Sequence, residues 1–99
     1  MNGIVVRYEY AGDEGKWRAA MGAFVAAVAA DDAVRGRFRY AITRQRGGAV
    51  RTHMGRWDSE ETLRTVQSRD YFKTFAAAVQ EFGGASVTTT PMEVVESTD

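Results

Sequence analysis

A pair of glycines, Gly47-Gly48, separates two strand-like segments, and this feature constrains the fold more strongly than any other. A two-residue hairpin turn needs positive φ angles, which glycine adopts without a steric penalty. The flanking segments are therefore predicted to pair as an antiparallel hairpin centred on the glycines. In that register Ile42 lies opposite His53 and Phe38 lies opposite Trp57, so the only histidine of the chain shares a face with a tryptophan.

The register also divides the side chains of the sheet between two faces, because successive residues of a strand point to opposite sides. One face is expected to pack against helices and carries an aromatic set: Ile4, Val6, Tyr8, Phe38, Tyr40, Ile42, His53 and Trp57. The other face carries arginines beside apolar residues: Val5, Arg7, Glu9, Arg37, Arg39, Val50, Met54 and Arg56. This second face is too apolar to be only solvated and too charged for a private core, which suggests that a partner covers it.

The segments around the hairpin alternate between strand and helix patterns. Residues 4–10 alternate with period two, as expected of a half-buried strand. Residues 13–30 are predicted to form a helix that is capped by Asp13 and carries an apolar stripe at helical spacing. The stripe consists of Trp17, Met21, Phe24 and Val28. After the second hairpin strand, Asp58 is the predicted N-cap of a short helix, with Glu61 three residues further on.

The last third of the chain completes the pattern. A second helix start is predicted at Ser68 or Asp70, and this helix should end at Gly83-Gly84. Residues 85–96 are rich in Val and Thr, which favours a strand, and Pro91 predicts an edge position because proline cannot donate to a ladder. The order strand, helix, two strands, helix, strand predicts one ferredoxin-like α+β domain over residues 1–99, a four-stranded antiparallel sheet with both helices on one face.

Composition narrows the classes of partner. Thirteen basic and thirteen acidic residues cancel, so no charge excess argues for nucleic acid or an anionic membrane. The chain has no cysteine, which excludes disulfides and thiolate ligands, and its single histidine supports no metal site. The apolar run from Met21 to Ala30 is too short to span a bilayer. We therefore expect a cytoplasmic protein with neither nucleic acid, membrane nor metal as partner.

The block Trp57-Asp58-Ser59-Glu60-Glu61 and the later block Ser68-Arg69-Asp70-Tyr71-Phe72, in this element order, resemble the antibiotic biosynthesis monooxygenase (ABM)-like family of the dimeric α+β barrel superfamily. The resemblance covers nearly the whole chain in architecture. It implies a homodimer whose two sheets face each other, with a ligand pocket in each subunit between helices and sheet. Members include cofactor-independent oxygenases of aromatic and quinol-type substrates, so the resemblance implies no cofactor.

The family also contains haem-degrading enzymes, from which this chain departs. Their asparagine, tryptophan and haem-ligating histidine align with Val6, Val66 and Ala76, so the resemblance argues against haem degradation. Many other members carry a histidine nine residues after the tryptophan, where this chain has Val66. The resemblance therefore leaves open whether the protein is catalytic.

The chemistry available to this chain depends on residues near the predicted helix–sheet interface. His53 is the candidate base, and Tyr40 is its candidate catalytic partner. A further set is predicted to contact an aromatic substrate: Tyr8, Tyr10, Trp17, Met21 and Trp57. The alternative for all of them is a structural role, in which His53 bonds a backbone carbonyl and the aromatic residues form the core.

The arginines of the other face, Arg7, Arg37, Arg39 and Arg56, allow two interpretations. In the first interpretation, they pair with Glu9 and Glu93 across a dimer interface. In the second, they surround an anion. Two functions follow for the whole protein. The first is oxygenation, or a related transformation, of a small aromatic or polyketide-like compound. The second is a noncatalytic ligand-binding or accessory homodimer of the same fold.

Overall fold

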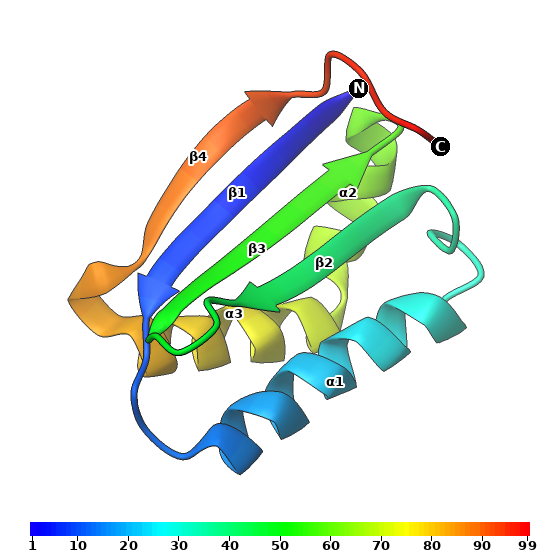
Figure 1. Ribbon diagram of the computed structural model, residues 1–99. Coiled ribbons are helices and arrows are strands. Elements are labelled where there is room, and N and C mark those ends of the chain that lie inside the picture. The colour runs from blue at the N-terminus through cyan, green and yellow to red at the C-terminus, as the bar shows by residue number, and fades with distance from the viewer.

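Four strands form one antiparallel sheet in the computed structural model, which describes residues 1–99, and the helices lie on one side of that sheet (Figure 1). The elements in chain order are β1 (Asn2–Glu9), α1 (Glu14–Ala30), β2 (Phe38–Arg44), β3 (Val50–Trp57), α2 (Glu60–Ser68), α3 (Asp70–Gly83), a short 3₁₀ turn (Gly84–Ser86) and β4 (Thr88–Glu93). The strand order across the sheet is β2-β3-β1-β4. The predicted ferredoxin-like α+β architecture is therefore confirmed. None of the helices is both long and apolar enough to cross a bilayer.

The hairpin between β2 and β3 has the predicted register, with Phe38 opposite Trp57 and Ile42 opposite His53. The turn itself differs from the prediction. Only Gly47 has a positive φ, of 71°, and the amide of Gly48 donates to the carbonyl of Gln45. A four-residue loop, residues 46–49, thus replaces the predicted two-residue turn. Because both loops are centred on the same peptide bond, the pairing of the strands is unchanged.

The helix ends show one correction. Asp13 caps α1 as predicted, since its carboxylate accepts from the amide of Lys16. The prediction that Asp58 caps α2 was wrong, because the hydroxyl of Ser59 accepts from the amide of Thr62 instead. The Asp58 carboxylate accepts from the Thr62 hydroxyl, so it holds the same turn through a side chain.

The last strand is shorter than predicted. Helix α3 ends at Gly83, and the next residue, Gly84, has a φ of 53°, a positive angle that glycine adopts without a steric penalty. The 3₁₀ turn occupies the start of the predicted last strand, so β4 begins only at Thr88. Pro91 lies on β4 opposite Ile4, and β4 is an edge strand, as the proline predicted.

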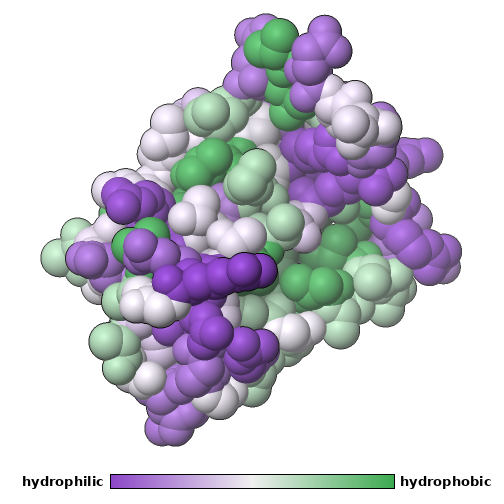
Figure 2. Space-filling view, viewed as in Figure 1, coloured by the Kyte–Doolittle hydropathy of each residue, from purple (hydrophilic) through white to green (hydrophobic).

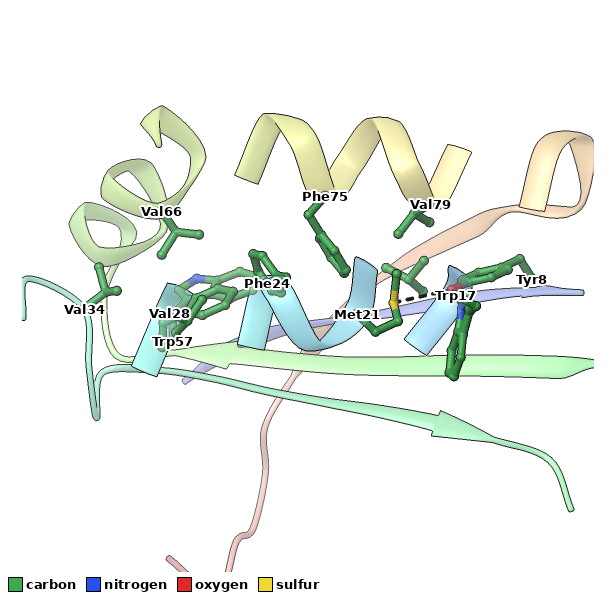
Figure 3. Close-up of a cluster of buried hydrophobic side chains, with 12 residues drawn as sticks. Tyr8, Trp17, Met21, Phe24, Val28, Val34, Trp57, Val66, Phe75 and Val79 are labelled. Carbon is green, nitrogen blue, oxygen red and sulfur yellow. Dashed lines mark hydrogen bonds between the residues drawn. The ribbon is translucent and has the colours of Figure 1, made fainter. Parts of the chain in front are cut away.

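The core lies between the sheet and the helices, and the predicted stripe of α1 forms one side of it (Figure 3). Phe24 of α1 stacks on Phe75 of α3 with ring centroids 3.9 Å apart. Val34, in the loop after α1, and Val66 of α2 are completely buried at one end of the cluster. The helices thus contact each other as well as the sheet, and a pocket beside α2 and α3 is described below.

Candidate functional site

A pocket of about 420 Å³ lies between the sheet and the helices α2 and α3. Its floor comes from β1, β2, β3 and β4, and its wall is mostly apolar. The lining residues are Gly3, Ile4, Val6, Phe38, Tyr40, Trp57, Leu63, Gln67, Phe72, Phe75, Ala76, Val79, Gln80, Val87, Thr89 and Pro91. A cavity of this size and polarity suits a small aromatic molecule better than a charged one.

A hydrogen-bonded chain of side chains lies under one wall of this pocket. The Tyr40 hydroxyl is 3.0 Å from Nδ1 of His53, and the Tyr8 hydroxyl is 2.9 Å from Nε2 of the same ring. The indole N–H of Trp17 donates to the Tyr8 hydroxyl over 2.8 Å. His53 is completely buried, and both of its nitrogens bond tyrosine hydroxyls rather than a backbone carbonyl.

Burial controls the protonation of this chain. Removal from water lowers the pKa of His53 to about 4, so the imidazole is neutral at pH 7. Burial also raises the pKa of Tyr40 above its usual value. The pKa of Tyr8 is raised by burial, although the N–H of Trp17 and the charge of Arg51 oppose this shift. All three groups are therefore uncharged near neutral pH.

Lowering the pH from 7 to 5 is expected to destabilise the folded state by roughly 2 kcal/mol through His53. The imidazole has a pKa of about 4 in the folded protein and 6.5 as its ordinary value, so in this interval the unfolded chain binds a proton and the folded one does not. Its stability contribution is thus complete above pH 6.5 and is lost as the pH falls toward 4. Urea unfolding at both pH values measures the difference, which a His53→Gln variant should lack. Equal stability of the wild type at pH 5 and pH 7 would contradict a buried neutral imidazole.

The structure separates the predicted site residues into two groups. Tyr40 and Trp57 line the pocket. His53 does not line the pocket, but it hydrogen-bonds Tyr40 and stacks on Phe75, and both of these residues do. Three others, Tyr8 of β1 and Trp17 and Met21 of α1, are buried together where the first half of α1 packs on the sheet, and they do not line the pocket (Figure 3). Tyr10, directly after β1, packs its ring on Phe82 of α3 and donates a hydrogen bond from its hydroxyl to the backbone carbonyl of Asp13.

Trp57 differs from the other residues of the pocket wall in one respect. Its side chain is 8% exposed, and its indole Nε1 has no hydrogen-bond partner in the protein. A buried donor without a partner costs free energy, and most buried polar groups in proteins are paired. This unpaired donor belongs to a residue of the pocket wall.

Sequence reasoning missed an ion pair between a buried arginine and a half-buried glutamate beside the site. Arg51 of β3 is 3% exposed, and its guanidinium bonds the carboxylate of Glu14 at 2.9 Å and the carbonyl of Tyr10 at 3.0 Å. The guanidinium also lies over the ring of Trp17, with 4.3 Å between its central carbon and the ring centroid. The signal was present in the alternation of β3, because Arg51 is two residues from His53 and must point to the same face.

The opposite face of the sheet, turned to the viewer in Figure 2, mixes apolar and hydrophilic surface. Arg39 and Arg56, which are paired across β2 and β3, both contact the carboxylate of Asp99 from the C-terminal segment. This contact raises the pKa of Arg56 and lowers that of Asp99. Arg7 and Arg37 are exposed. The partner of two of the arginines thus comes from the same chain and was not among the predicted carboxylates.

Replacing Gly55 with alanine is expected to destabilise the fold by about 1–3 kcal/mol and to displace Tyr40 from His53. Gly55 lies opposite Tyr40, and a Cβ at this position would stand 2.8 Å from the tyrosine ring, closer than real contacts allow. Gly22→Ala is the matched control, because a Cβ there meets nothing within 4 Å and alanine favours the helix. Chemical denaturation measures both effects, and a neutral Gly55→Ala variant would show that the ring has room to move.

Comparison with solved structures shows that this fold is a known one. Rv0793 from Mycobacterium tuberculosis aligns with a TM-score of 0.77, over 99% of this chain and 98% of that one. SnoaB, a cofactor-independent oxygenase from Streptomyces nogalater, aligns at 0.74 over 98% and 95% of the two chains. A predicted antibiotic biosynthesis monooxygenase from Deinococcus radiodurans also gives 0.74, over 100% and 97%. The chain has an ABM-like fold.

The ABM-like fold is shared here without close sequence similarity. The identities to these three proteins are 18%, 14% and 13%. Neither a protein-family model nor a curated protein sequence matches the chain. Similarity at this level concerns the backbone, so the ABM-like fold by itself assigns no substrate, and the argument for function rests on the site.

Proposed function

We propose that the protein is an ABM-type enzyme that oxygenates, or carries out a related transformation of, a small aromatic or polyketide-like compound in the helix–sheet pocket. The observation that carries this proposal is the apolar pocket of about 420 Å³ whose wall includes Tyr40, hydrogen-bonded to a buried neutral histidine. The similarity in fold to a cofactor-independent oxygenase supports it. In this proposal Tyr40 is the catalytic residue, His53 acts through it, and Trp57 contacts the substrate.

Oxygenation without a cofactor requires that the substrate itself supplies electrons to O₂. A methylene group that becomes a carbonyl consumes one O₂, and one oxygen atom enters the product while the other leaves as water with both hydrogens. The protein contributes a dry pocket and polar groups that stabilise negative charge on the ionised substrate. His53 acts through Tyr40 in this scheme, because it does not line the pocket itself.

A second candidate function, a noncatalytic ligand-binding or accessory protein, is favoured by the burial of His53. Both ring nitrogens are already hydrogen-bonded, and a pKa of about 4 makes the imidazole a weak base at neutral pH. In this alternative Tyr8, Tyr40 and His53 form a polar network that specifies the packing of the core. The pocket then binds its ligand without changing it.

Oxygen uptake separates the two candidates. Dihydroxynaphthalene- and anthrone-like compounds are incubated with the wild type, His53→Ala and Tyr40→Phe, and with Tyr71→Phe as a matched control. The Tyr71 hydroxyl donates to Asp31, away from the pocket, so its loss should leave turnover unchanged. Turnover that falls only in the first two variants supports catalysis at this site. Turnover equal in all variants discards the site, and binding without oxygen uptake favours the noncatalytic protein.

We also propose that the protein is a homodimer in which a second copy covers the open sheet face. Met54 is 56% exposed on that face, between Val5 and Ala41. Met54→Glu is expected to convert a dimer of 10.9 kDa chains into monomers, because it buries an unpaired charge in the interface. Val25→Glu is the control, since Val25 is 44% exposed on α1. Light scattering measures the mass, and a wild-type monomer would refute the dimer.

The expected cytoplasmic location stays a prediction.

A further inference from the structure

The hydroxyl of Tyr8 lies at a junction of three possible partners. It is 2.8 Å from the indole nitrogen of Trp17, 2.9 Å from Nε2 of His53 and 3.9 Å from the sulfur of Met21 (Figure 3 shows the first and third). An indole N–H can only donate, so the Tyr8 oxygen accepts from Trp17. The single proton of the hydroxyl then goes to the histidine nitrogen or to the sulfur.

Geometry decides between these two acceptors. An imidazole nitrogen at 2.9 Å is at a normal hydrogen-bond distance, whereas a thioether sulfur is a weak acceptor and is a full 3.9 Å away. The Tyr8 hydroxyl therefore donates to Nε2 of His53. A neutral imidazole carries its proton on the other nitrogen, so Nδ1–H donates to the Tyr40 oxygen over 3.0 Å.

With the hydrogen bonds in this direction, the proton of one hydroxyl has no acceptor in the protein. The Tyr40 hydroxyl has no hydrogen bond other than the one with His53, and in that bond its oxygen is the acceptor. Tyr40 belongs to the pocket wall. We propose that the hydrogen bonds that link Trp17, Tyr8, His53 and Tyr40 all run in one direction, with each donor pointing toward the pocket. Tyr40 then donates its proton to a ligand whose facing atom is a carbonyl or anionic oxygen.

This inference rests on the proposed function for the use of the pocket, and it specifies the ligand class. Each donor in the chain polarises the next one, which strengthens the last hydroxyl as a donor. Tyr40 then stabilises negative charge on the ligand oxygen, and His53 holds Tyr40 in this orientation as a positioning residue. The opposite direction, with Nδ1 accepting from Tyr40, would make the pair a proton acceptor and would select a ligand with a hydroxyl donor.

The first arm of the test determines which nitrogen of His53 carries the proton. The chain has one histidine, so ¹⁵N–¹H correlation spectra of protein without a histidine tag contain a single imidazole. A proton on Nδ1 at pH 7 is expected. A proton on Nε2 would overturn the proposal. This measurement uses the free protein and needs no ligand, so its outcome is independent of what the pocket binds.

The second arm compares two probes that differ by one carbonyl group, 1-tetralone and tetralin. The wild type is expected to bind the ketone about 3- to 10-fold more tightly, which is the net effect of one neutral hydrogen bond. Tyr40→Phe should remove this preference, and Tyr71→Phe should keep it. An equal affinity of the wild type for both probes overturns the assignment of the ligand class.

The two arms also separate this inference from the proposed function. Failure of both probes to bind, with the proton on Nδ1, would refute the pocket as a ligand site and with it the ligand class. Oxygen uptake that requires Tyr40, with the proton on Nε2, would support the enzyme while refuting the direction of the chain.

Discussion

Tyr40→Phe is expected to lower the turnover number about 100- to 1,000-fold, the effect typical of removing one donor that stabilises charge in the transition state. The substitution removes the hydroxyl that contacts His53 from a residue of the pocket wall. The aromatic ring remains, and with it the packing against Phe24 and Phe75. Steady-state oxygen uptake with an anthrone-like substrate measures the change, in kcat more than in KM.

The structural contribution of the hydroxyl needs its own control. Tyr8→Phe removes the other hydroxyl from His53 but leaves the pocket wall unaltered, because Tyr8 does not line it. Its turnover should fall less than that of Tyr40→Phe, while its unfolding midpoint should fall at least as much, since Tyr8 is 1% exposed. Equal losses of turnover in the two variants would indicate that both act only through the stability of the core.

Phe24→Ala is expected to reduce the free energy of unfolding by about 3–5 kcal/mol. Phe24 of α1 is 2% exposed, stacks on Phe75 of α3 and contacts Phe38 and Tyr40 of β2 edge to face. It therefore joins α1 and α3 to the sheet. Domains of this kind have roughly 5–15 kcal/mol of stability in total, so the variant should be close to unfolded at 37 °C. Urea denaturation at 25 °C measures the loss.

The neighbouring residue supplies the control for that substitution. Val25→Ala removes apolar side-chain atoms from a position that is 44% exposed on the same helix, and its cost should be below 1 kcal/mol. A loss of less than about 1.5 kcal/mol for Phe24→Ala would mean that the surrounding aromatic residues close the cavity.

Much of the sheet was predictable because a strand has only two faces. The glycine pair set the register, and the register placed His53 and Trp57 on the helix-covered face. Alternation alone also placed Arg51 there, where sequence reasoning passed over it because an arginine is rarely buried without a partner. The partner, Glu14, is 37 residues away in the sequence, because it lies at the start of α1 whereas Arg51 lies on β3. A pairing of that kind depends on tertiary packing that no local pattern reports.

The position of the pocket was not predictable from periodicity. Alternation assigns a residue to a face but does not say where across the face it lies. Tyr8 and Tyr40 share one face, yet α1 covers Tyr8 while Tyr40 borders the gap beside α2 and α3. The division depends on how three helices share the surface of four strands, which is decided by side-chain volumes.

The contrasting surroundings of the two tryptophans give the protein two built-in fluorescent probes. Trp57 borders the pocket, and Trp17 lies under the guanidinium of Arg51 with its indole nitrogen hydrogen-bonded to Tyr8. A ligand in the pocket would quench or shift the emission of Trp57 and leave Trp17 nearly unaffected. In a Trp17→Phe variant, the fluorescence of Trp57, the one remaining tryptophan, would therefore report occupancy of the pocket without any attached dye.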